Sequence, residues 1–173
     1  MRKLMLGAVM ALVLPAAALA GQGAPTATAL ATKACKTEKS QMGTKTFKNT
    51  YAAKSVAKAT KACLAKQGVA AETQIRNAAQ ACKAERAAMG TEGFVQKYAP
   101  AGTNHNGRNA HGKCVSSRAR AASAERTENR VAAAETCNTM TADKAAFDER
   151  FGTGKNAFGK CVSKTAKALA QAE

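Results

Sequence analysis

The apolar residues of this 173-residue chain are sparse, and the larger ones recur at helical intervals. Three pairs of aromatic residues occur, and the two members of each pair are four positions apart, which places both rings on one face of a helix. Alternation of apolar and polar residues, the pattern of strands, is absent. Residues 115–136 contain no glycine or proline and consist mostly of good helix formers. The pattern predicts an all-α fold with a long helix over 115–136. The aromatic pairs are Phe47 with Tyr51, Phe94 with Tyr98, and Phe147 with Phe151.

The predicted helices fall into three units, and each unit opens and closes with a cysteine. The stretch "NAHGKCVSSRARA" over 109–121 is nearly repeated as "NAFGKCVSKTAKA" over 156–168. The opening cysteines of the first two units are offset by 47 residues, and so are the closing cysteines of the last two, a period typical of helical repeats. We therefore expect three tandem cysteine-paired helical repeats that form one continuous array over 34–173. The repeats are expected over 34–66, 81–118 and 136–165.

Glycine and threonine mark the expected ends of helices. Gly43 and Gly90 lie where a left-handed cap would end a helix and let a short aromatic helix follow. The third unit lacks this glycine, so Thr141 is expected to cap its short helix directly. Gly68 is expected to break the connection between the first two units, and residues 100–112 form a polar, turn-rich loop.

The beginning of the chain has the features of an export signal. A basic start, an apolar stretch over 4–14 and the small residues Ala18 and Ala20 predict that residues 1–20 are a signal peptide. Residues 21–33 would then form a short N-terminal lead. No later apolar run reaches membrane length, so we expect no transmembrane segment in the mature chain. The predicted location is secreted or cell-envelope associated.

The composition leaves little material for a hydrophobic core. The chain carries 27 lysines and arginines against 11 acidic residues, a formal charge of +16. Leu, Ile, Val and Phe make up roughly a tenth of the mature chain, a content typical of disordered chains when the charge is high. Alanine is abundant, but it buries little apolar area. Disulfides in an oxidising compartment would supply the missing stability.

Helix length restricts how the six cysteines pair. If 115–136 is one helix, Cys114 and Cys137 lie about 35 Å apart at 1.5 Å per residue. A disulfide needs Cα atoms within about 7 Å, so that pairing is excluded if the helix is real. A metal site is the alternative, but the cysteines are not spaced as CxxC and no histidine accompanies them in register. Pairing within each unit is the economical solution: Cys35–Cys63, Cys82–Cys114 and Cys137–Cys161.

The segment "ACKAERAAMGTEGFVQKYA", followed by "NAHGKCVS", resembles a cysteine-paired repeat of uncharacterised secreted bacterial proteins. The resemblance covers residues 34 to about 165. The first unit departs from it most in its closing half, and the third in its opening half. The resemblance implies export and helices built from repeats, and it implies no activity.

Residues suited to catalysis or metal binding are few. His105 and His111 are the only histidines, and Phe158 takes the position of His111 in the third unit, which favours packing over ligation for His111. Paired cysteines would leave no thiol nucleophile, and no paired carboxylates suited to acid–base chemistry are evident. We therefore expect no catalytic residue, no metal, no cofactor and no enzyme activity.

The basic charge is the remaining signal. Lysines dominate the first unit, where Glu38 is the only acid, and arginines line the predicted long helix. Such a field attracts polyanions such as wall teichoic acids, anionic lipid headgroups or nucleic acid, although charge also serves solubility alone. The few aromatic residues argue against sequence-specific nucleic-acid recognition. The candidate polyanion-binding residues are Lys36, Lys39, Lys45, Lys48, Lys54, Lys58, Lys61, Arg118, Arg120, Arg126 and Arg130.

Two functions from different classes are compatible with these features. The first is a non-catalytic exported helical-repeat protein that associates electrostatically with anionic cell-envelope polymers or another extracellular polyanion. The alternative is a secreted effector, either an inhibitor or an antimicrobial-like protein, acting on a protein or membrane target through the loop tip at 104–108. The sequence does not specify the oligomeric state.

Overall fold

The computed structural model describes residues 25–99 and 109–172, and within these ranges it contains five helices and no strand. The all-α prediction is confirmed. No helix in the described ranges is long and apolar enough to cross a membrane. The predicted signal peptide, residues 1–20, and the loop tip at 104–108 lie outside the described residues. The helices are α1 (Ala27–Thr50), α2 (Val56–Tyr98), α3 (Ala110–Met140), α4 (Lys144–Phe151) and α5 (Ala157–Leu169).

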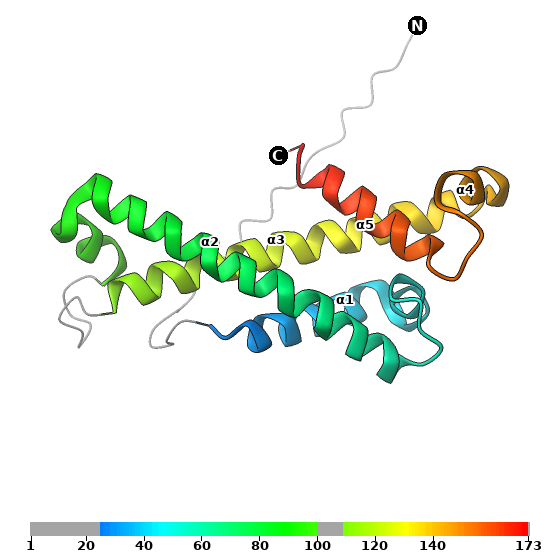
Figure 1. The fold of residues 1–173 in the computed structure, drawn as a ribbon, viewed down its shortest axis with the longest axis horizontal. Coiled ribbons are helices and arrows are strands. Elements are labelled where there is room, and N and C mark those ends of the chain that lie inside the picture. The colour runs from blue at the N-terminus through cyan, green and yellow to red at the C-terminus, as the bar shows by residue number, and fades with distance from the viewer. Residues whose placement is uncertain (1–24, 100–108, 173) are drawn as a thin grey trace, which may run out of the picture.

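Two long helices are each shared by successive units. α2 carries Cys63, which closes the first unit, and Cys82, which opens the second; α3 carries Cys114 and Cys137 in the same way. Figure 1 shows α2 and α3 crossing as an antiparallel pair along the length of the molecule, with α1 and α5 against them. The units are therefore parts of one continuous array of helices rather than separate domains.

All three predicted disulfides are present. Each joins the opening helix of a unit to its closing helix, with Cα–Cα distances of 6.0, 6.0 and 6.1 Å. All six cysteines are therefore bridged, which excludes the alternative of a cysteine metal site. Closing loops of this length stabilises by roughly 3–4 kcal/mol per bridge in the chain-entropy model. The bonds are Cys35–Cys63, Cys82–Cys114 and Cys137–Cys161.

The aromatic pair of each unit packs beside its disulfide. The two rings of each pair lie 4.8–5.1 Å apart between centroids, as expected for aromatic contacts on one helical face. Phe47 and Phe94 are almost completely buried. Three small cores therefore form, each centred on a disulfide, and alanine fills the contacts between the long helices. This arrangement explains how a chain with few large apolar residues remains compact.

Of the three glycines expected to interrupt helices, two do so and one does not. Gly43 and Gly90 have positive φ angles of 73° and 78° and turn the chain sharply inside α1 and α2, as predicted for helix ends. Gly68, by contrast, lies within continuous α2, so the predicted break there is wrong. A single glycine costs a helix only about 1 kcal/mol, which the packing of buried Cys63 and Ala71 on either side offsets.

The short helix of the third unit starts later than predicted. Thr141 ends α3 as its C-cap, and Asp143 caps α4 by accepting a hydrogen bond from the Ala146 N–H at 3.1 Å. The prediction that Thr141 caps this helix is therefore wrong. An aspartate two residues farther along supplies a stronger N-cap than threonine.

The N-terminal lead is helical where it is described. α1 begins at Ala27, so most of the lead expected over 21–33 forms the first turns of that helix. Leu30 is buried and packs into the core that surrounds Cys82–Cys114. The start of α1 therefore connects the first unit to the second.

Candidate functional site

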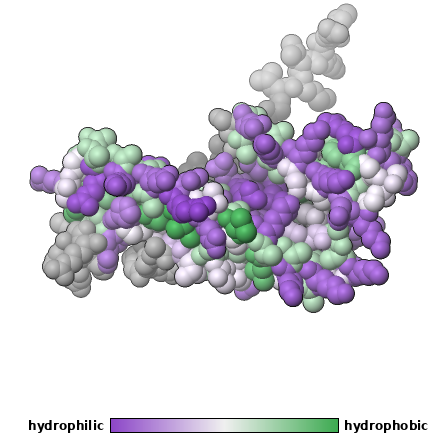
Figure 2. Space-filling view, in the orientation of Figure 1, coloured by the Kyte–Doolittle hydropathy of each residue, from purple (hydrophilic) through white to green (hydrophobic). Residues whose placement is uncertain are grey.

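The predicted lysines of the first unit carry the exposed charges between Cys35 and Cys63. All but Lys48 are exposed, and none has an ion pair with a described residue. Glu38, the only acid between Cys35 and Cys63, is fully buried and cannot offset their charge at the surface. Figure 2 shows hydrophilic side chains crowding the right-hand end of the molecule, where Figure 1 places the C-terminal part of α1 and α4. We call the exposed set the first-unit lysine surface: Lys36, Lys39, Lys45, Lys54, Lys58 and Lys61.

A hollow of about 440 Å³ extends this basic surface toward the third unit. Lys48 and Lys54 line it from the end of α1 and the following turn, and Lys144 and Lys155 line it from the third unit. Asp148 is the only acid in the lining, and it pairs with Lys144. Alanine and phenylalanine side chains contribute the apolar part of the wall. The hollow therefore combines an excess of lysine with an apolar surface.

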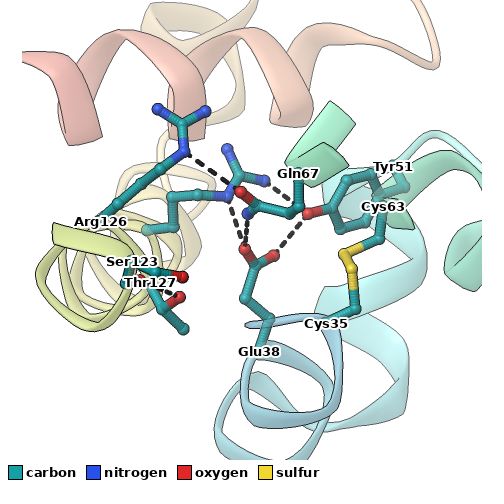
Figure 3. The surroundings of a disulfide bond; sticks show 9 residues. Cys35, Glu38, Tyr51, Cys63, Gln67, Ser123, Arg126 and Thr127 are labelled. Atoms are coloured by element: carbon teal, nitrogen blue, oxygen red, sulfur yellow. Dashed lines mark hydrogen bonds and ion pairs between the residues drawn. A yellow bond between two sulfur atoms is a disulfide. The ribbon is translucent and has the colours of Figure 1, made fainter. Parts of the chain in front are cut away.

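Glu38 is held in a buried network next to the Cys35–Cys63 disulfide (Figure 3). Its carboxylate accepts hydrogen bonds from Arg130 Nε at 2.8 Å, from Tyr51 Oη at 2.5 Å and from Gln67 Nε2. The side chains of Arg130 and Glu38 are 3% and 0% exposed. Burial above all, with the Glu38 carboxylate in addition, raises the pKa of Tyr51, against the opposing charge of Arg130. The network joins α1, α2 and α3.

The prediction that Arg130 belongs to a polyanion-binding surface is therefore wrong. Its guanidinium lies inside the protein and neutralises Glu38, because a buried charge requires a partner of opposite sign. Burial alone would lower the pKa of Arg130, but the attraction of Glu38 and Tyr51 raises it.

The remaining arginines of α3 do not form one exposed line. Arg118 is partly exposed and pairs with Glu85 at 2.8 Å. Arg120 is half-buried, and Arg126 is half-buried with its Nε donating to Gln67 Oε1 at 3.2 Å. The structure thus separates the lysines of the first unit from the arginines of α3, which the sequence had grouped by charge alone.

The second unit repeats the glutamate–tyrosine contact of the first, but near the surface. Tyr98 Oη donates to both carboxylate oxygens of Glu85, at 2.9 and 3.1 Å, and Lys97 and Arg118 complete the cluster. Hydrogen bonds from Lys97 and then Arg118 lower the pKa of Glu85 to about 2. In both units the two partners are separated by 13 residues.

The third unit replaces this polar pair with an apolar one. Met140 follows Cys137 by three residues, as Glu38 follows Cys35, and Phe151 takes the place of Tyr51. Both residues pack in or against the core around Cys137–Cys161. Loss of the carboxylate thus accompanies loss of the hydroxyl that would have bonded to it. This paired change is the sequence signal from which the Glu38 contact could have been recognised.

The histidines contribute no assembled site. His111 is exposed, whereas Phe158 is buried, so the prediction that His111 packs is wrong. His105 lies outside the described residues. Within the described ranges, no three His, Cys, Asp or Glu residues are placed to hold a metal ion together.

Comparisons with protein-family models, curated proteins and solved structures found no match. The resemblance to cysteine-paired repeats of secreted bacterial proteins stays a prediction.

Proposed function

We propose that this protein is a non-catalytic, exported helical-repeat module that binds an anionic cell-envelope polymer through the first-unit lysine surface. The observation that carries the proposal is the burial of Glu38, the only acid between Cys35 and Cys63. Every exposed ionised side chain between Cys35 and Cys63 is a lysine, because the single acid is enclosed and neutralised by Arg130. Such a surface attracts polyanions and releases their counterions.

The hollow beside Lys48 and Lys54 supports the same function. A polymer lying along the end of α1 would meet Lys144 and Lys155 of the third unit as well, so contacts from two units would add. Only two large apolar side chains are exposed in the described ranges, Val69 and Met89 on α2. This distribution favours electrostatic contact over insertion into a membrane. The three disulfides suit an oxidising, extracytoplasmic compartment.

The test measures binding of the oxidised protein to teichoic acid, with double-stranded DNA and anionic vesicles as competing polyanions, over a range of salt concentrations. Replacing the six lysines of the first-unit lysine surface by glutamine should weaken teichoic acid binding by about 100-fold or more at low salt and reduce its salt dependence. These lysines are exposed and make no ion pair with a described residue, so the fold should be retained.

A control variant with the same change in net charge separates location from total charge. It replaces six exposed basic residues elsewhere in the array by glutamine and should bind nearly as well as the wild type. Equal losses in the two variants would contradict the proposed surface, and inhibition of growth by the wild-type protein without polymer binding would favour the secreted effector. The control residues are Arg76, Lys83, Arg86, Arg150, Lys160 and Lys164.

A further inference from the structure

A second basic hollow lies in the middle of the array, between α2, α3 and α5. Its volume is about 470 Å³, within the range of small-ligand sites. None of the six residues of the first-unit lysine surface lines it. The charged and donor side chains in its wall include Lys66, Glu125, Arg126, Asn129, Arg130 and Lys167.

Cations in this wall outnumber the carboxylates that could neutralise them. Arg130 is already neutralised by Glu38, and Glu125 has no ion pair with a described residue. Lys66 Nζ donates to the neutral hydroxyl of Ser163 at 2.9 Å. Lys66 is exposed to solvent, but the loss of water on the side that faces the protein, followed by the charges of Arg130 and Arg126, lowers its pKa. An ammonium in such a position is stabilised by an anion that enters the hollow.

Arg126 also has a neutral hydrogen-bond partner and pairs with no carboxylate of the described residues. Its Nε donates to the amide oxygen of Gln67, a neutral partner, and Figure 3 shows its guanidinium directed away from the Glu38 carboxylate. Burial and then the charge of Arg130 lower its pKa. Because a guanidinium is a planar fork of donors, the groups that Gln67 does not occupy match the oxygens of a phosphate.

Asn129 supplies an independent observation. Its Nδ2 is the one buried side-chain nitrogen or oxygen atom in the described ranges that has no hydrogen-bond partner. Buried donors are normally satisfied, and leaving one unpaired costs about 1–3 kcal/mol. Asn129 lines the same hollow as Lys66 and Arg126, so a rotation of its enclosed amide toward the hollow would bring the unpaired donor to an acceptor bound there.

We propose that the hollow between α2, α3 and α5 is a binding site for a phosphate group. Arg126 and Lys66 supply charge-assisted donors, Lys167 adds positive charge at the wall, and the Asn129 amide supplies a neutral donor. A tetrahedral oxyanion fits this set because it presents several acceptor oxygens to donors that come from three helices. The site does not depend on the polymer-binding surface, so either proposal can fail while the other stands.

The experiment is calorimetric titration of the oxidised protein with inorganic phosphate, pyrophosphate and glycerophosphodiester at constant ionic strength. We expect saturable binding of one equivalent, weakened by about tenfold or more in Lys66→Gln and in Arg126→Gln. Lys83→Gln is the matched control, since this exposed lysine lies on the same helix outside both the hollow and the first-unit lysine surface, and it should bind like the wild type. Preference for inorganic phosphate identifies a free ion or monoester as the ligand class, and preference for the diester identifies a polymer or lipid headgroup.

A second measurement keeps the test decisive if Arg126→Gln disturbs the fold through Gln67. In the wild-type protein, the NMR signals of the Asn129 side-chain amide and of the Arg126 Nε–H should shift together and saturate as phosphate is added. The proposal is overturned if none of the three anions binds. It is equally overturned if both glutamine variants bind like the wild type, or if the two NMR signals do not move while phosphate binds.

Discussion

Removing the buried carboxylate of Glu38 should be among the most damaging single changes to the folded state. In Glu38→Met, the Arg130 guanidinium remains 3% exposed but loses its counter-charge, and Tyr51 and Gln67 lose their acceptor. Breaking a buried ion pair from one side costs about 3–5 kcal/mol. Domains of this kind have total stabilities of about 5–15 kcal/mol, so the loss is a large part of the whole.

The third unit suggests how to recover that stability. Its Met140 and Phe151 show that a Met–Phe pair is compatible with this architecture. The triple variant Glu38→Met, Tyr51→Phe, Arg130→Met removes both charges and the hydroxyl together, so what remains unpaired in this network is the neutral Nε2 donor of Gln67 rather than a buried charge. Apolar replacement of a complete buried pair is often neutral. We expect the triple variant to return to within about 2 kcal/mol of the wild type.

Urea denaturation followed by far-UV circular dichroism measures both effects, with the disulfides kept oxidised. At a slope of about 2 kcal/mol per M, the single variant should lower the midpoint by about 2 M. Glu72→Gln, at an exposed glutamate of α2 with no ion pair to a described residue, is the control and should change the free energy of unfolding by less than about 0.5 kcal/mol. The reasoning is refuted if Glu38→Met costs less than about 1 kcal/mol or if the triple variant is no more stable than the single one.

Three further changes test other contacts with the same assay. Gly159→Ala should cost about 1–3 kcal/mol of folding stability, because the added Cβ would lie 2.7 Å from a backbone carbonyl oxygen of α1. Gly112→Ala is the control and should be neutral or stabilising, because no atom of a described residue lies within 4 Å of the added Cβ. Equal effects of the two substitutions would contradict this contact. Glu85 has a folded-state pKa of about 2 against an ordinary value of 4.5, so its carboxylate stabilises the fold above pH 4.5 and loses that contribution as the pH falls toward 2. The difference in urea midpoint between wild type and Glu85→Gln should therefore shrink over that range. A constant difference would exclude the assigned pairing. Replacing both Cys137 and Cys161 by serine should cost about 3 kcal/mol, and no loss would show that this bridge does not constrain the unfolded chain.

The features that sequence predicted correctly depend on local spacing. The two rings of each aromatic pair are about one helical turn apart in the sequence. The helix that follows Cys114 is long enough to exclude a bond between Cys114 and Cys137. This exclusion made pairing within each unit the economical prediction, and the structure confirms it. The glycines at 43 and 90 were recognisable because a left-handed backbone strongly favours this residue.

The features that sequence missed depend on contacts between distant segments. Arg130 and Glu38 are 92 residues apart, and charge counting assigns both to the surface unless their contact is known. His111 is exposed whereas Phe158, at the matching position, is buried, because each closing helix faces different neighbours. The cation-rich hollow at Lys66 requires three helices to meet, and no single stretch of sequence carries that information.

The sharing of α2 and α3 between units has a consequence for how such a protein gains or loses length in evolution. A unit ends in the same helix in which the next begins, so a cut between helices would leave one cysteine of each bridge without its partner. The segment that can be duplicated without this loss starts in the middle of one long helix and stops in the middle of the next. Each inserted copy would add one helix, assembled from the halves of two existing ones, and reverse the direction of the helices that follow. Recombination points inside helices, rather than in loops, would therefore generate longer relatives of this chain.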